Sequence, residues 1–331
     1  MITRALILLV LATATVSALT EDKVNQQFDV TPGGKIIVDV DFGTIDVAAG
    51  ADDKVAIDAH REIDSDDATK EKEYLTAAPI LVIKDGNSVI IRSKLQEKDR
   101  DLHWSGHGKM DARYVVRVPH QFDSDLRTGG GSIVGAELTG TMSADTSGGK
   151  LKFTHLRGSI SATTSGGSIE LNGCEGPLNV VTSGGHIEAT DGSGSLEART
   201  SGGSIVIKNF GGDTEVETSG GRLALENING KIVGRTSGGS IIAQLRSPVP
   251  GDVHLRTSAG SIEVSVPPDA GLDVEAETNI GRVTSELPVS GTRDDHEQLK
   301  GKINGGGKAL VLHSSAGSIS IKPTSTETAK R

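Results

Sequence analysis

Two glutamates, Glu170 and Glu188, are the residues of this chain best placed to do chemistry together. They occupy the same place in successive copies of a repeat. If the copies stack as neighbouring parallel strands, the carboxylates lie roughly 5 Å apart, near the separation of the acid pair in a retaining glycosidase. Such an enzyme also needs a cleft and sugar-binding aromatic side chains, and no aromatic residue falls near this face. We therefore interpret both glutamates as surface charge on a long sheet, with a polysaccharide lyase or glycosidase that has a shallow groove as the alternative.

A short histidine-containing segment is the second candidate, as a metal or ligand site. His103 and His107 are close in sequence, with Asp101 and Asp111 nearby. Metal binding needs ligands that are held in a fixed geometry, and other residues must hydrogen-bond to those ligands to orient them. Residues 96–110 are polar and predict a loop, so we expect a solvated loop without a metal.

The single cysteine, Cys174, excludes an intramolecular disulfide and a cysteine-based metal site. In the repeat it shares a column with Leu138, Leu156, Phe210 and Ile228, which predicts a small buried thiol rather than a nucleophile. The Gly-Gly runs lack the rest of a phosphate-binding loop, and no Gly-x-Ser-x-Gly elbow occurs. We therefore predict no catalytic, metal-binding or cofactor-binding residues, no cofactor and no enzymatic activity.

A repeat of constant length determines which elements position these side chains. Its motif, Thr-Ser-Gly-Gly-x-Ile/Leu, begins in phase at Thr146, Thr164, Thr182, Thr200, Thr218 and Thr236. Thr128 extends the series upstream in the same phase, and looser copies begin at Thr257, Thr278 and Ser314, at longer intervals. We expect the last interval, from Thr278 to Ser314, to hold two coils with altered loops.

Within the repeat, numbered from its threonine, apolar and polar positions alternate. Positions 6, 8, 15 and 17 are mostly aliphatic, whereas positions 5, 7, 16 and 18 are mostly polar or charged. Alternation with a period of two is typical of half-buried strands, and glycine at positions 3, 4 and 13 predicts corners. We therefore predict an all-β fold, a single-stranded parallel β-solenoid (β-helix) with coils of about 18 residues.

Residues 1–18 carry the pattern of a secretory signal peptide. Arg4 precedes an apolar run from Ala5 to Val16, and Val16-Ser17-Ala18 provides a cleavage site. We expect cleavage after Ala18 and no transmembrane span in the mature chain. The formal net charge of −10 argues against a nucleic-acid partner, because such partners require a basic surface.

Residues 19–122 lack the regular repeat and predict a β-rich cap with one short helix. Solenoids need caps because an open end is an unpaired strand edge. We expect a helix over 65–77 with Ser65 as its N-cap, a hairpin around Asp85-Gly86, and strands at 35–40, 44–48, 54–60 and 112–118. The predicted organisation is a signal peptide (1–18), a cap with the first coils (19–122), the solenoid (123–323) and a tail (324–331).

These features resemble the bacterial putative-adhesin β-strand-repeat family, a β-helical domain of unknown function. The resemblance rests on the Thr-Ser-Gly-Gly-x-Ile units after a strand ending in Val118-Pro119, and on Ile303-Asn-Gly-Gly-Gly-Lys-Ala-Leu before Ser-Ala-Gly-Ser-Ile. It covers roughly residues 28–322 and implies an exported β-helical protein without established catalytic residues. The family often shows Ser-Gly-Asp at its corners, so the corners of this chain carry fewer carboxylates for cations.

Together, these observations predict an exported, non-catalytic protein of the bacterial cell envelope or extracellular space, acting as an adhesin-like binding surface or scaffold. We expect it in the periplasm, on the outer surface or secreted. The expected partner is a cell-surface glycan or an envelope protein.

Overall fold

The computed structural model describes residues 20–65, 67–96, 108–294 and 296–324. The predicted signal peptide, His103, His107 and residues 325–331 of the predicted tail lie outside these described residues. The predictions made for those segments therefore remain predictions.

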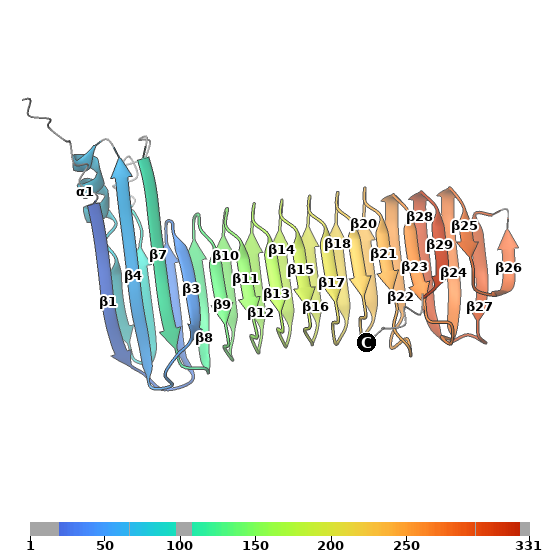
Figure 1. Cartoon of the computed structure of the whole chain (residues 1–331), viewed down its shortest axis with the longest axis horizontal. Helices are drawn as coiled ribbons and strands as arrows, with labels where there is room; N and C mark the ends of the chain where they lie inside the picture. The colour runs from blue at the N-terminus through green and yellow to red at the C-terminus, as the bar shows by residue number, and fades with distance from the viewer. Residues whose placement is uncertain (1–19, 66, 97–107, 295, 325–331) are drawn as a thin grey trace, which may run out of the picture.

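Two long sheets enclose one hydrophobic core and give the molecule its elongated shape (Figure 1). In the described residues, sheet A has 14 strands and sheet B has 15. The repeats contribute one short strand per coil to each sheet. Those in sheet A are β9 (Ile133–Ala136), β11 (Leu151–Thr154), β13 (Ile169–Asn172), β15 (Ile187–Thr190), β17 (Ile205–Lys208), β19 (Leu223–Glu226) and β21 (Ile241–Gln244). Those in sheet B are β8 (Phe122–Thr128), β10 (Met142–Thr146), β12 (Ile160–Thr164), β14 (Leu178–Thr182), β16 (Leu196–Thr200), β18 (Thr214–Thr218) and β20 (Ile232–Thr236).

Successive coils pair in parallel register, so equivalent side chains stack in columns. Ile187 lies opposite Ile169 on one side and Ile205 on the other, and all three side chains are 0% exposed. Glu188, the next residue along β15, is only partly buried, in agreement with the alternation of the sequence. Narrow coils with an aliphatic interior agree with the predicted all-β parallel architecture.

The threonine that begins each repeat is buried and ties neighbouring coils together. Thr182 Oγ1 donates to the carbonyl of Gly167 in the preceding coil at 2.8 Å, and accepts from the N–H of Gly185 at 3.3 Å. Equivalent bonds from threonine to the glycine carbonyl recur at Thr146, Thr164, Thr200, Thr218, Thr236 and Thr257. These hydroxyls satisfy backbone groups inside the corner that would otherwise be buried without partners.

The two glycines of the motif differ in how closely the next coil approaches. A Cβ on Gly185, at position 4, would lie 1.9 Å from the carbonyl oxygen of Gly167, which no side chain allows. A Cβ on Gly184, at position 3, would meet nothing nearer than 3.7 Å. Position 4 therefore requires glycine because of close backbone approach, and position 3 does not.

The opposite corner uses left-handed backbone. Position 10 has a positive φ in every regular coil from Glu137 (58°) to Asn227 (53°), including His155 (50°). Three residues on, Gly158 has a φ of 127°. The polar residues of position 10 are thus turn residues, as their types predict.

The N-terminal region continues the solenoid before departing from it. Its strands are β1 (Thr20–Asp29), β2 (Gly34–Val40), β3 (Thr44–Ala49), β4 (Lys54–Ser65), β5 (Leu81–Asp85), β6 (Ser88–Ser93) and β7 (Gly108–Val118). β2 and β3 pair in parallel with β8 and β9, and β6 and β7 stack outside them. β4 and β1 then extend sheet A in antiparallel fashion, and β5 ends sheet B.

The helix α1 (Ala68–Ala77) begins later than predicted. Its N-cap is Asp67, whose carboxylate accepts from the N–H groups of Thr69 and Lys70, so the assignment of Ser65 as N-cap is wrong. Ser65 ends β4, and its N–H and hydroxyl donate to Glu71 at 2.7 and 2.8 Å. No helix within the described ranges combines the length and the apolar character needed to cross a membrane.

A buried arginine fastens the helix to both sheets. The Arg61 guanidinium, 0% exposed, donates to Ala78 O at 2.6 Å, to Ser93 Oγ at 2.9 Å and to Asp22 at 2.9 Å. A charge this deeply buried needs such partners to offset its loss of hydration. This network links β4 to the end of α1, to β6 and to β1.

The C-terminal coils do not stack in chain order. Their strands are β22 (Val253–Ala259), β23 (Ile262–Val266), β24 (Leu272–Ile280), β25 (Val283–Ser285), β26 (Ser290–Asp294), β27 (Gln298–Ile303), β28 (Lys308–Ala316) and β29 (Ile319–Pro323). β28 lies between β22 and β24, and β29 lies between β23 and β25, so the final coil is inserted into the stack.

The prediction of two coils between Thr278 and Ser314 is therefore wrong. β26 and β27 form an antiparallel hairpin that pairs with β24 and ends sheet B. Because every coil presents similar side chains at equivalent positions, a coil can pair with more than one other coil. The repeat in the sequence therefore does not determine the order in which the coils stack.

Candidate functional site

The predicted carboxylate pair is brought together on sheet A. Glu170 and Glu188 lie directly opposite each other on β13 and β15 and line a shallow depression of about 390 Å³. Lys150 forms an ion pair with Glu170, whose side chain remains 29% exposed. A glycosidase acid needs an apolar environment that keeps it protonated at neutral pH, and the one aromatic residue in this lining, Phe153, is fully buried. The geometry therefore favours a charged surface over an acid–base pair.

Cys174 is buried, as its column predicts. Its side chain is 0% exposed, and its Sγ lies 3.7 Å from the carbonyl oxygens of Phe153 and Asn172. Burial raises the pKa of the thiol above its usual range, because the core disfavours the thiolate. A thiol that is both inaccessible and protonated is a poor nucleophile.

One cluster of potential metal ligands was missed by the sequence reasoning. Glu21, His60 and Glu62 place their nearest ligand atoms within 4.8 Å of one another on β1 and β4. Lys23 is 2.6 Å from Glu21 and competes with a cation there. Glu21 is far in sequence from His60 and Glu62, and only the antiparallel pairing of β1 with β4 brings the three together, so no motif could have revealed the cluster. Asp111, predicted near the histidine loop, lies on β7 opposite Glu62.

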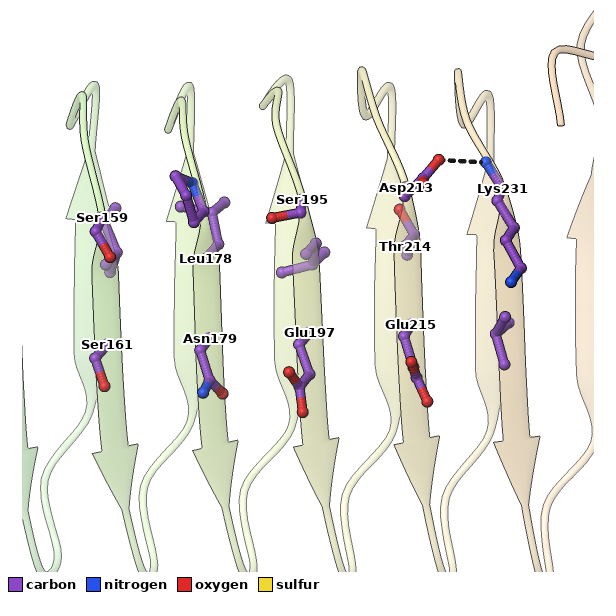
Figure 2. A pocket seen from close by; sticks show the side chains of 14 residues that line it. Ser159, Ser161, Leu178, Asn179, Ser195, Glu197, Asp213, Thr214, Glu215 and Lys231 are labelled. Carbon is purple, nitrogen blue, oxygen red and sulfur yellow. Dashed lines mark hydrogen bonds between the residues drawn. The ribbon is translucent and has the colours of Figure 1, made fainter.

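The outer face of sheet B carries a row of polar side chains, called here the polar row. Ser161, Asn179, Glu197 and Glu215 come from the neighbouring strands β12, β14, β16 and β18 (Figure 2). They line a shallow depression of about 480 Å³. Because the strands are in register, the donors and acceptors of the row repeat at the strand spacing of about 4.8 Å.

Arginines on the same face balance the acids of the polar row. Arg199 pairs with Glu197 and lies 3.7 Å from Glu217, and Arg235 lies 2.7 Å from Glu215. At the edge of the depression, Asp213 accepts from the backbone N–H of Lys231 at 2.8 Å (Figure 2). Arg199, Glu217 and Arg235 alternate in charge on adjacent strands at position 18 of the repeat, and together with the glutamates of the polar row they form a charge network on an exposed sheet.

A different kind of depression lies at the corner that carries position 10. Asn209, Asn227, Asn229, Arg246 and Ser247 contribute to the lining of a hollow of about 490 Å³. A second hollow of about 510 Å³ shares Ser247 and continues past Pro248 toward Lys308. The longer interval between the repeats at Thr236 and Thr257 was the sequence signal for an altered corner here.

Comparison with known proteins agrees with this architecture. The family model described as Toastrack DUF4097 matches residues 34–322. No curated protein matches the chain.

Three solved structures are similar over most of the chain. They are a "putative cell adhesion protein" from Clostridium sporogenes (11% identity, 92% of this chain and 100% of that chain, TM-score 0.23), a "putative adhesin" from Bacteroides fragilis (13%, 91% and 97%, TM-score 0.31) and a "putative lipid binding protein" from Parabacteroides distasonis (12%, 92% and 97%, TM-score 0.39).

Proposed function

The chain belongs to the Toastrack DUF4097 family, and we propose that it is an exported, non-catalytic protein whose long sheets serve as an adhesin-like binding surface or scaffold. The partner is a cell-surface glycan or an envelope protein. Residues 19–122 form the cap of the solenoid and its first coils.

The observation that carries this proposal is the polar row with its charge network. Ser161, Asn179, Glu197 and Glu215 present side chains at a regular spacing on an open face, which suits an extended polar partner. Their acids are already paired with Arg199 and Arg235, so the face offers hydrogen bonds more than reactive groups. Extended concave or flat surfaces of this kind are how solenoids bind their partners.

Export is the second part of the proposal and rests on the sequence of residues 1–18. N-terminal sequencing of the protein recovered from the periplasm or culture medium tests it. A chain that begins at Leu19 supports export, whereas a chain that retains Met1 contradicts it.

Binding and catalysis are separated by testing the same preparations for both. Wild-type protein and the variants Glu170→Gln and Glu188→Gln are incubated with immobilised envelope glycans and envelope proteins, and the soluble products are analysed. Retention of a partner without new reducing ends or unsaturated sugars is the expected result. Cleavage that disappears in Glu188→Gln would establish the alternative, a carbohydrate-active enzyme that uses the two opposed carboxylates.

A further inference from the structure

The corner between β21 and β22 departs from the repeat and creates the hollows beside it. Residues 245–252 connect these strands, whereas the shorter segment 227–231 connects β19 and β20. One hollow lies on each side of this loop, and Ser247 lines both.

A ladder of side-chain amides ends at the first hollow. Asn209 Nδ2 donates to Asp191 at 2.9 Å, and Asn227 Nδ2 donates to Asn209 at 3.1 Å. Glu226 pairs with Gln244, so Leu245 occupies the position in the next coil that is equivalent to Asn227. Leu245 is buried and has no side-chain amide, so the ladder ends at Asn227. Asn227 Oδ1 is therefore left as an acceptor at the hollow, without a partner in the described residues.

Donors complete the lining. Arg246 is exposed, and its guanidinium makes no ion pair or hydrogen bond within the described ranges. The side-chain amide of Asn229 is likewise exposed and has no partner in that part of the chain. Gly192 and Gly211 contribute no side chain, which keeps the hollow open.

The chemistry of this lining selects a ligand residue that carries one carboxylate and several hydroxyl groups. A guanidinium binds a carboxylate with two parallel hydrogen bonds, and amides pair with hydroxyl groups as donor and acceptor. The lining holds one arginine, which can bind one carboxylate, so the hollow has room and charge for one acidic sugar residue of a longer chain. The hollow of about 490 Å³ has the size of a small-molecule site.

We propose that this hollow binds a carboxylate-bearing sugar residue, such as a uronic acid, of an envelope or extracellular polysaccharide. Arg246 binds the carboxylate, and Asn227 and Asn229 bind ring hydroxyls. The inference rests on the proposed binding function and names both a place and a ligand class for it.

Calorimetric titration with the trimers of galacturonate, glucuronate and mannuronate tests the proposal. At least one trimer is expected to bind, and Arg246→Gln is expected to weaken that affinity about tenfold or more, because a charge-assisted hydrogen-bond pair is lost. The control is Arg222→Gln, which removes another exposed arginine, unpaired in the described ranges, from the opposite corner. It should bind as the wild type does, and thermal unfolding should be unchanged in both variants.

The titration would overturn the proposal if no uronate trimer bound, if neutral galactotriose bound equally well, if Arg246→Gln and Arg222→Gln lost equal affinity, or if triglutamate bound equally tightly. The last result would assign the hollow to an acidic peptide. Retention of envelope glycans that is independent of Arg246 would refute this site and leave the proposed function standing. Cleavage of a trimer would refute the proposed non-catalytic function itself.

Discussion

At the scale of single residues, the threonine that begins each repeat is the most informative side chain. Its hydroxyl is buried in the corner, where it donates to one coil and accepts from its own. Ser183, the next residue, is exposed and has no side-chain hydrogen bond in the described residues. The threonine hydroxyl of the motif therefore stabilises the corner, whereas the serine hydroxyl faces solvent.

Replacing the buried hydroxyl in Thr182→Val should destabilise the protein by about 1–3 kcal/mol. The change leaves the Gly167 carbonyl and the Gly185 N–H short of a partner inside the corner. Urea unfolding measures the loss. Ser183→Ala is the matched control and should stay within about 0.5 kcal/mol of wild type; equal losses in both would contradict the assignment.

Cys174 should resist thiol reagents in the native protein. Its raised pKa means that less thiolate is present at any given pH than for a free cysteine, and burial blocks access as well. Raising the pH from 7 to 9 should therefore leave native labelling slow, whereas denaturant should make it rapid. Fast labelling of the folded protein at neutral pH would show that the thiol is accessible.

At the scale of elements, the corners decide which substitutions a coil accepts. A Cβ at Gly185 would overlap the Gly167 carbonyl, but a Cβ at Gly184 would make only ordinary contact. Neither glycine has a left-handed φ, so contact with the preceding coil is what separates them. The sequence alone does not reveal this difference, because both positions are glycine.

Gly185→Ala should therefore be destabilising, at the upper end of about 1–3 kcal/mol, because two backbones must move apart. Gly184→Ala should be neutral or stabilise the fold by about 0.4–1 kcal/mol, since alanine restricts the unfolded chain. Chemical denaturation of the two variants side by side measures both effects. A ranking in the opposite order would refute the close approach at position 4.

Sequence periodicity predicted the strands and their faces well, because burial repeats with the same period as the backbone. Ile187 and Glu188 fall inside and outside as the alternation indicates, and Glu170 meets Glu188. The hollow beside Arg246 was not predicted, since an insertion breaks the period and its path depends on tertiary contacts. The Glu21, His60 and Glu62 cluster escaped for a related reason, the antiparallel register of β1 and β4.

At the scale of the whole molecule, both ends of the array depart from chain order. β6 and β7 stack outside β2 and β3, although β8 and β9 follow them in sequence. At the other end, β28 and β29 are inserted between coils that precede them. One hint was available, because Ser-Ala-Gly-Ser-Ile occurs after both Thr257 and Ser314, whose strands pair.

Ending the chain after Gly307 should loosen the C-terminal end without unfolding the central coils. The deletion removes β28 and β29, so β24 and β25 lose their parallel partners, and β22 and β23 become edges. Hydrogen exchange should show lost protection over 253–303 and retained protection from β10 to β16, because repeats couple mainly to their neighbours. A chain ending after Thr324 is the control, and equal protection in the two proteins would contradict the inserted position of β28.

The inserted coil also imposes a sequence of events on synthesis. In the regular coils, each strand pairs with a strand one repeat later in the chain, as Ile169 pairs with Ile187. Val253 instead pairs with Leu310, which lies about three repeats later. The longer closure costs only about 1 kcal/mol in equilibrium free energy, yet contacts of high sequence separation slow folding. Because chains emerge from the ribosome N-terminus first, a growing array can lengthen coil by coil as far as β23 and must then pause with an open edge. Resistance to edge-to-edge association is therefore acquired last, when residues 308–323 have been made.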